Sequence, residues 1–484
     1  MIRNGKKKAI SCALVAAMSV GLAACGTTSY DFKVSYDGIK TGDVSSKVSV
    51  HDPSILKADG EYYIFGSHMS AAKSSDLLNW EKVADGYSKK NPVYGQIYDV
   101  ADEAFAYSGS KNSLIKTDDK QVHVWAPDVI YNETTGLYYM YYCTTSTWNA
   151  SNLCYGTSTT PEGPYEWQGA LIYSGFNRKT ISGTDVLDYV DEDYAYKNYI
   201  KGAQYNYEDY PNAIDPTVFY DADGRMWMVY GSWSGGIFLL EIDKTTGLVI
   251  HPEADKANNV DPYYGKRLLG GGHISIEGPY IMYDETSGYY YLFVSYGALT
   301  SNGGYQVRVF RSKTVDGEYV DMNGKYPEKS AQHQNFGLKL TGNYKLPSLE
   351  KAYMATGHNS AFVDDDGRMY LVYHTRFNDN GEGHSPRVHQ MLVNEDGWPC
   401  ELPYQTQGET VNKDGYDADD IIGRYYVINQ GTAIDSKIAN PVILYLEKNG
   451  KVKGEKSEGT WECKDGSYYM NITIDGKKYS GVFC

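Results

Sequence analysis

Five short segments of this chain place an acidic residue or a histidine a few residues ahead of a glycine. The five head residues are Asp52, Asp128, Asp215, Glu277 and His358, which precede Gly60, Gly136, Gly224, Gly288 and Gly367 by 8, 8, 9, 11 and 9 residues. Taken alone, an aspartate before a proline is commonly just a turn residue. Recurrence at one position of a repeated unit predicts instead that the five side chains share one site.

Several carboxyl groups in one cleft suit the hydrolysis of glycosidic bonds. That reaction needs a protonated carboxyl group, which gives a proton to the leaving oxygen, and an ionised carboxylate, which activates water or attacks carbon. A third carboxylate raises the pKa of the acid by like-charge repulsion and keeps it protonated near neutral pH. Calcium binding is the rival chemistry, but the heads lack the dense alternating aspartates of an EF-hand loop.

Each head begins a segment with the pattern of a β-hairpin. A short apolar stretch, an acidic turn with glycine and an aromatic-rich stretch follow one another in residues 51–68, 126–143, 214–233, 277–297 and 357–376. Asp-Gly and similar pairs accept the positive φ of tight turns between antiparallel strands. Further short strands between the hairpins, at 153–160, 237–243 and 306–312, extend the units to about four strands each.

Five such units predict an all-β fold, a five-bladed β-propeller over residues 46–405. The innermost strand of every blade lines the propeller axis, so the heads would meet in one pocket. Helical periodicity is almost absent, with a short candidate at 184–190, which excludes a TIM barrel or a Rossmann fold. A second β-rich pattern at 414–484 predicts a small barrel or sandwich. Because the chain stops directly after a strand, we expect this C-terminal domain to be incomplete.

Residues 1–25 have the pattern of a bacterial export signal. Basic residues at positions 3, 6, 7 and 8 precede an apolar stretch that starts at Ala9 and ends in small residues. Leu22-Ala23-Ala24-Cys25 resembles a lipobox, which would leave a lipid on Cys25 and anchor the protein to a membrane. A plain signal peptide is the alternative. In both cases residues 26–45 form a linker and the folded part works outside the cytoplasm.

The composition narrows the range of partners. A formal net charge of −16 argues against nucleic acids and anionic membrane surfaces, because the long-range field repels phosphate. A neutral substrate suits the chain better, and its 48 tyrosines supply strand residues and faces that stack on sugars. Five cysteines remain outside the signal, an odd number. Cys143 and Cys154 flank a short loop and could form a disulfide, but they lack the neighbours of a zinc site.

The heads lie in motifs that resemble those of glycoside hydrolase family 43, and within it the endo-α-1,5-L-arabinanases. In chain order these motifs are HDPS (51–54), WAPD (125–128), NAIDP (212–216), YGSWSGGI (230–237), EGPY (277–280), GHNS (357–360) and RVHQM (387–391). The stretch at 423–435 also resembles the start of the β-domain that follows the propeller in longer arabinanases.

The resemblance assigns roles that the residues alone leave open. It implies that Asp52 is the general base, that Glu277 is the general acid, and that Asp215 raises the pKa of the acid and orients it. The family inverts configuration, which places the base and acid carboxyl groups roughly 6.5–9.5 Å apart with a water between them. For Asp128 the resemblance implies no catalytic role, and we expect a structural hydrogen bond there.

The resemblance also implies sugar contacts and a bound ion. The expected substrate-binding residues are Asp52, Trp148, Asn149, Asn212, Ala213, Ile214, Asp215, Ser232, Trp233 and Ser234. His358 matches a histidine that touches a largely water-coordinated calcium ion, although calcium prefers oxygen ligands. The acidic, tyrosine-rich insertion at 177–211 either shapes a wall of the cleft or is a solvated loop.

The expected function is therefore that of an exported, lipid-anchored, inverting hydrolase that cuts internal α-1,5 bonds of arabinan. An exo-acting α-L-arabinofuranosidase or a β-xylosidase on the same fold is the nearer alternative, and loops that block one end of the cleft would distinguish it. A non-catalytic glycan-binding propeller is the third, and the presence of all three carboxyl groups favours an enzyme.

Overall fold

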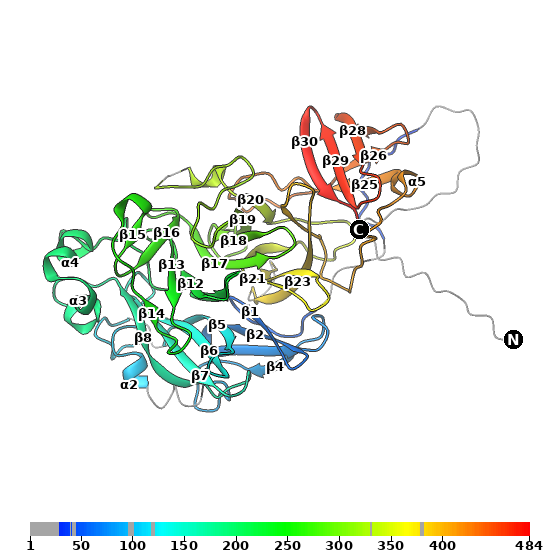
Figure 1. Cartoon of the computed structure of the whole chain (residues 1–484). Helices are drawn as coiled ribbons and strands as arrows, with labels where there is room; N and C mark the ends of the chain where they lie inside the picture. The colour runs from blue at the N-terminus through cyan, green and yellow to red at the C-terminus, as the bar shows by residue number, and fades with distance from the viewer. Residues whose placement is uncertain are drawn as a thin grey trace.

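The computed structural model of the chain describes residues 29–38, 40, 45–94, 101–117, 122–329, 332–377 and 382–484. The predicted export signal and Cys25 lie outside these residues. The described chain consists largely of strands, which form five large sheets in succession, a sixth large sheet at the C-terminal end and a two-stranded sheet within the segment 177–211 (Figure 1). No helix within the described ranges has both the length and the apolar character needed to cross a membrane.

The first five sheets are antiparallel and each begins with a predicted hairpin. Sheet one contains β1 (Ser54–Ala58), β2 (Glu61–Gly66), β3 (Ser70–Ser74) and β4 (Glu81–Ala84). Sheet two contains β5 (Val124–Asn132), β6 (Leu137–Thr145), β7 (Ser151–Ser158) and β8 (Glu166–Ser174). Sheet three contains β11 (Thr217–Tyr220), β12 (Met226–Tyr230), β13 (Ile237–Ile242), β14 (Val249–Ile250), β15 (Val260–Asp261) and β16 (Gly265–Leu269).

Sheets four and five return to the four-strand plan. Sheet four contains β17 (Ile276–Asp284), β18 (Tyr289–Tyr296), β19 (Gln306–Ser312) and β20 (Leu338–Thr341). Sheet five contains β21 (Met354–Val363), β22 (Met369–Arg376), β23 (Ser385–Val393) and β24 (Pro399–Glu401). The predicted turn glycines adopt φ values that favour glycine, at Gly60 (80°), Gly136 (70°), Gly224 (73°), Gly288 (63°) and Gly367 (81°). The five predicted hairpins are thus confirmed.

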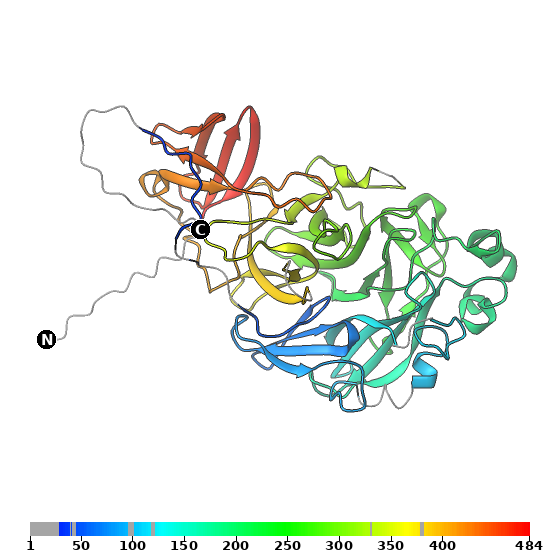
Figure 2. The same cartoon turned by 180° about the vertical axis from the view of Figure 1, so that it is seen from behind.

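The five sheets close into a cycle. Their first strands contact one another in the order β1, β5, β11, β17, β21 and again β1. A hydrophobic cluster fills each space between neighbouring sheets, with Tyr142, Tyr230, Tyr296, Phe293 and Ile64 among the buried members of the successive clusters. The opposite views in Figures 1 and 2 show the sheets arranged around a common centre. Residues far apart in sequence therefore meet where the first strands begin.

Cys143 and Cys154, which flank a short loop and could have formed a disulfide, do not form one. Both thiols are free, because the two residues lie on opposite faces of sheet two. Cys154 pairs across the ladder with Tyr142, the neighbour of Cys143. Since successive side chains of a strand point to opposite faces, the two sulfur atoms belong to different core clusters.

The insertion at 177–211 folds into ordered structure. It contains η2 (Ile181–Gly183), α3 (Val186–Tyr189), α4 (Glu192–Asn198), β9 (Ile200–Lys201) and β10 (Gln204–Tyr205). The helix predicted near 184–190 is thus confirmed, and α4 begins where Asp191 accepts a hydrogen bond from the Tyr194 amide at 2.7 Å. Tyr199 and Tyr205 are buried in the core between sheets two and three. The insertion is therefore not a merely solvated loop.

The C-terminal sheet is a six-stranded antiparallel meander (Figure 1). Its strands are β25 (Gly423–Val427), β26 (Val442–Leu446), β27 (Lys451–Gly454), β28 (Glu458–Cys463), β29 (Tyr469–Ile474) and β30 (Lys477–Val482). The remaining short helices of the described chain are η1 (Ser67–Met69), α2 (Ala101–Ala104), η3 (Lys256–Asn258), η4 (His333–Asn335) and α5 (Ala418–Ile421). Part of the predicted linker lies on this sheet, where Arg424 donates to the Lys33 carbonyl at 2.9 Å.

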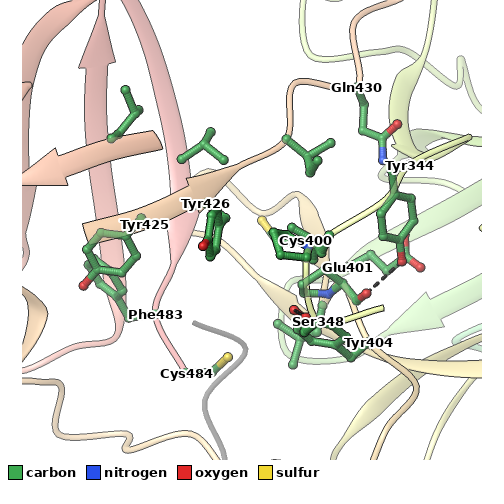
Figure 3. A pocket seen from close by; sticks show the side chains of 18 of the residues that line it. Tyr344, Ser348, Cys400, Glu401, Tyr404, Tyr425, Tyr426, Gln430, Phe483 and Cys484 are labelled. Atoms are coloured by element: carbon green, nitrogen blue, oxygen red, sulfur yellow. Dashed lines mark hydrogen bonds between the residues drawn. The ribbon is translucent and has the colours of Figure 1, made fainter. Parts of the chain in front are cut away.

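A cavity of about 800 Å³ separates the C-terminal sheet from sheet five (Figure 3). Its walls are mainly apolar and aromatic, with Tyr344 and Tyr404 on one side and Tyr426 and Phe483 on the other. None of the five heads lines it. This cavity is therefore separate from the predicted catalytic site.

Candidate active site

The structure corrects the register of the five heads. The equivalent backbone position is a residue with positive φ, which lies shortly before the first strand at Asp52 (55°) and Asp215 (55°) and within it at Ala126 (43°), Gly278 (55°) and His358 (47°). Asp128 lies two residues after this position and Glu277 one residue before it. The prediction of one shared position is therefore wrong for these two heads.

The residues two positions further along join neighbouring sheets. Ser54 and the Val218 amide both donate to the carboxyl group of Asp128, the latter at 2.6 Å. Thr217 donates to the Pro279 carbonyl and Ser360 to the Pro53 carbonyl, both at 2.8 Å. Burial raises the pKa of Asp128 to about 7, against the effect of these hydrogen bonds. Asp128 therefore has the hydrogen bonds of the structural role expected for it.

Asp52 has an environment that keeps its carboxylate charged. Its Oδ1 lies 3.0 Å from Nδ1 of His358 and 3.2 Å from Nε2 of His51, and its Oδ2 accepts from Ser67 at 2.5 Å. Burial alone would raise the pKa of Asp52, but the charge of His358, its hydrogen bond and the charges of the neighbouring His51 and His374 together hold that pKa well below its usual range. Conversely, Asp52 and Asp215 raise the pKa of His358 to about 9 despite burial. The pair exists as carboxylate and imidazolium at neutral pH.

The environments of Asp215 and Glu277 favour the protonated form of both carboxyl groups. Asp215 accepts a hydrogen bond from the Gly278 amide at 3.1 Å, next to Glu277. Burial raises the pKa of Asp215 to about 7, and the charges of Glu277 and Asp52 act in the same direction. Removal from water also raises the pKa of Glu277, and Asp52 adds to the effect. One ionised carboxylate therefore lies among two groups that favour the protonated form.

Glu277 accepts hydrogen bonds at both carboxyl oxygens. Tyr305 donates to Oε1 at 2.7 Å, and the indole of Trp233 donates to Oε2 at 2.6 Å. Ser232 donates to the same Oε2 at 3.3 Å. Two residues that were expected to contact sugar therefore also orient the predicted acid.

Aromatic side chains extend from Glu277 toward solvent. The ring of Trp233 lies 5.4 Å from that of His273, which lies 5.5 Å from Trp148 and 5.7 Å from Tyr207. Trp148 is 63% exposed, an unusual state for tryptophan in a protein with a large core. We call Trp148, Tyr207, Trp233 and His273 the aromatic platform. Its exposed faces suit stacking on sugar rings.

The remaining residues expected to bind substrate lie around this platform. Asn212 accepts from Ser151 at 2.7 Å and donates to the Trp148 carbonyl at 2.9 Å, so it fixes the loop that carries Trp148 and Asn149. Ser234 lies 3.5 Å from His273. The side chains of Ala213 and Ile214 are buried in the core between sheets two and three.

His358 is a poor ligand for the expected calcium ion. Its Nδ1 faces the Asp52 carboxylate, and its raised pKa keeps the ring protonated, whereas a metal ligand must be neutral. A better group lies beside it. His51, His374 and His384 place ring nitrogens within 4.8 Å of one another, and burial lowers all three pKa values. The Nε2 atoms of these three residues are buried and make no hydrogen bond.

Sequence reasoning missed Ser67, Tyr305, His273 and His374. Ser67 links the Asp52 carboxylate to the Ala126 amide, where its hydroxyl accepts at 2.9 Å. These residues lie in second strands or connecting loops, while the repeated pattern marks only the start of first strands. The aromatic-rich ends of the hairpins are the sequence signal nearest to these residues, but aromatic content does not distinguish site residues from core residues.

Comparison with known proteins identifies the family. The model for glycosyl hydrolases family 43 matches residues 44–209 and 191–399, and the model for a C-terminal lipocalin-like domain matches residues 403–484. The chain is 37% identical over 466 residues to extracellular endo-alpha-(1->5)-L-arabinanase 2 of Bacillus subtilis, covering 91% of this chain and 88% of that protein. It is 39% identical over 438 residues to the extracellular endo-alpha-(1->5)-L-arabinanase of Thermotoga petrophila, covering 88% and 84%.

A solved structure agrees with these matches. The crystal structure of the Thermotoga petrophila endo-1,5-alpha-L-arabinanase superposes with a TM-score of 0.76 at 38% identity, covering 92% of this chain and 93% of that one. With the family model spanning most of the chain and relatives aligned nearly end to end, this protein belongs to glycosyl hydrolases family 43.

Proposed function

We propose that this protein is an inverting endo-α-1,5-L-arabinanase. The observation that carries the proposal is the division of three neighbouring carboxyl groups into one ionised group, Asp52, and two that favour the protonated form, Asp215 and Glu277. Acid and base can be assigned where the environment pushes pKa values apart in this way. The names of the two similar relatives supply the substrate.

In this reaction Asp52 takes a proton from a water molecule as the water oxygen attacks the anomeric carbon. The glycosidic C–O bond breaks, its electron pair goes to the leaving oxygen, and Glu277 gives that oxygen a proton. When it is ionised, Asp215 favours the protonated form of Glu277, and through the Gly278 amide it holds the backbone beside that residue. His358 balances the charge of Asp52 and stays outside the proton transfer.

We infer that the five sheets form a five-bladed β-propeller with the catalytic groups at one end of its axis. The closed cycle of first strands supports this, since a ring of sheets with their first strands inward is the propeller plan. The aromatic platform then forms a wall of the substrate cleft. Because it reaches well away from Glu277, it fits a polymer that extends past the cleaved bond, as endo action requires.

For the ion we propose a site beside His358 rather than on it. His51, His374 and His384 offer three neutral nitrogens, which suit zinc or nickel better than calcium, while calcium would need water to complete its shell. Such an ion would supply positive charge close to Asp52. Titration of the metal-free protein with each ion, followed by protein fluorescence, would separate these possibilities.

We further propose export of the protein and a lipid on Cys25. The two similar relatives are extracellular by name, and the lipobox pattern is the support for the anchor. Mass spectrometry of the mature N-terminus would test it: a diacylglyceryl-modified Cys25 is expected, and an unmodified terminus elsewhere would refute the anchor.

Incubation with linear 1,5-α-arabinan tests the activity. Early products should be a mixture of oligosaccharides, and the newly formed reducing ends should have the configuration opposite to that of the cleaved bond. Release of arabinose alone would indicate exo action, and absence of any cleavage would reject the enzyme.

A further inference from the structure

Tyr305 is the most deeply buried of the three side chains that donate to Glu277. Its side chain is 1% exposed, and its hydroxyl donates to Oε1 of Glu277 at 2.7 Å. The other donors, Ser232 and Trp233, bond to Oε2, and Trp233 is itself part of the aromatic platform. The two oxygens of Glu277 are thus distinct, since Oε2 lies toward the cleft and Oε1 lies toward the interior.

The position of the Tyr305 ring is closely defined. A Cβ at Gly357 would come within 2.3 Å of the ring, so glycine is required on that side. The His374 ring lies parallel to it at 5.9 Å. On the chain side, Gly304 abuts residues 434 and 435 of the C-terminal region, and Gln306 donates to the Ala433 carbonyl at 3.0 Å. These contacts hold the phenol of Tyr305 beside Glu277.

We propose that Tyr305 is a positioning residue for the reaction, which holds Oε1 of Glu277 so that Oε2 delivers the proton to the leaving oxygen. This rests on the proposed role of Glu277 as general acid. When Oε2 loses its proton, the negative charge spreads over both oxygens. The hydrogen bond from Tyr305 then becomes charge-assisted, and such bonds are shorter and stronger than neutral ones. Tyr305 therefore stabilises the transition state more than the ground state.

Replacing Tyr305 by phenylalanine tests this role. Hydrogen bonds to charged groups contribute enough that kcat on arabinan should fall about 10- to 100-fold. KM should stay within a factor of about two, because the phenol does not touch substrate. Loss of a donor to the carboxylate also makes Glu277 harder to ionise, so the alkaline limb of the kcat profile should move to higher pH. A purely structural defect would not move that limb.

Tyr296→Phe is the matched control. Tyr296 is a fully buried tyrosine in the adjacent strand β18, and its hydroxyl has no hydrogen-bond partner. That variant should keep wild-type kinetics and the wild-type pH profile. If Tyr305→Phe also keeps kcat within twofold and an unmoved alkaline limb, the proposal is wrong.

A substrate whose leaving group needs no protonation tests the role of Tyr305 and the role of Glu277 as general acid separately. On an aryl arabino-oligosaccharide with an acidic phenol, both Glu277→Gln and Tyr305→Phe should regain most of their lost rate. Recovery of Glu277→Gln without recovery of Tyr305→Phe would overturn the role of Tyr305 alone. Failure of Glu277→Gln to recover would overturn the assignment of the acid.

Discussion

At the scale of single residues, the site holds three carboxyl groups in different protonation states. Asp52, Asp215 and Glu277 are all removed from water, which raises the pKa of any carboxyl group. Only Asp52 lies in contact with the His358 imidazolium, at 3.0 Å. The neighbouring histidines, with His358 the strongest among them, therefore separate the predicted base from the predicted acid.

Substitution of the two main carboxyl groups should remove most activity. Asp52→Asn and Glu277→Gln are each expected to lower kcat on linear arabinan about 10²- to 10⁴-fold, which is the usual contribution of a general base or acid. Reducing-end assays give the rate, and circular dichroism verifies the fold. Asp128→Asn is the control, since Asp128 holds Ser54 and Val218 and should leave kcat nearly unchanged. Near wild-type rates in either main variant would contradict the assignment.

The pH profile should respond to Asp215 in a defined direction. Activity needs ionised Asp52, whose pKa lies well below its usual range, and protonated Glu277, whose raised pKa sets the alkaline limb. The charge of Glu277 raises the pKa of Asp215, and the interaction is mutual. Above about pH 7, where Asp215 ionises, Asp215→Asn removes a negative neighbour of Glu277, so the alkaline limb of kcat/KM should move to lower pH by about one unit. An unmoved limb would show that Asp215 acts only on geometry.

The sequence predicted the five hairpins, and it predicted that Asp52, Asp215, Glu277 and His358 come together in one site. It misplaced Glu277 and Asp128 relative to the other heads because β17 and β5 each contain a register shift near the head. A bulge adds residues on one strand without changing the alternating pattern that reveals the hairpin. Tyr305 was not predictable, since it reaches Glu277 from a connection that carries no repeated motif.

At the scale of elements, the aromatic platform combines parts from different segments. Trp148 comes from the loop after β6, Tyr207 from the insertion at 177–211, and His273 from the connection after β16. Asn212 ties the first of these to the start of the β11 hairpin by its bond to the Trp148 carbonyl. The insertion therefore helps to build the predicted wall of the cleft.

Removal of the exposed indole should affect long substrates selectively. Trp148→Ala is expected to raise KM for arabinan about tenfold, from the loss of one stacked ring, and to leave the kcat on the shortest cleaved oligosaccharide unchanged. A series of arabino-oligosaccharides of increasing length measures the effect. Tyr189→Ala is the control, because Tyr189 is 49% exposed but stacks on His251 away from the platform. Equal effects on all lengths would argue against a remote sugar site.

At the scale of the whole molecule, a buried arginine fastens the C-terminal region to sheet four. Arg308 is fully buried and donates to the carbonyls of Gln334, Phe336 and Thr432. The segment at 428–441 thereby runs over the strand that follows Tyr305 (Figure 2). The two regions of the protein are thus joined close to the catalytic groups.

Loss of this arginine should loosen the C-terminal segment. Arg308→Met leaves three carbonyls without their donor and is expected to cost about 2–3 kcal/mol of unfolding free energy. Thermal unfolding measures the loss, and limited proteolysis should show new cleavage within 428–441. Lys437→Met is the control, since that side chain lies in the same segment and is 88% exposed. Unchanged stability and proteolysis would show that the contact is dispensable.

The way in which the cycle of five sheets closes predicts how the enzyme loses activity on heating. Every one of the first five sheets consists of strands that are contiguous in the chain, so no β ladder within the described residues crosses from sheet five to sheet one. That seam relies on side-chain packing and a few hydrogen bonds, such as the one from Ser360 to the Pro53 carbonyl. Asp52 lies on one side of the seam, and its partners His358 and His374 lie on the other. Slight parting of the seam on heating would therefore separate the base from its counter-charge, and inactivation should precede the loss of β structure.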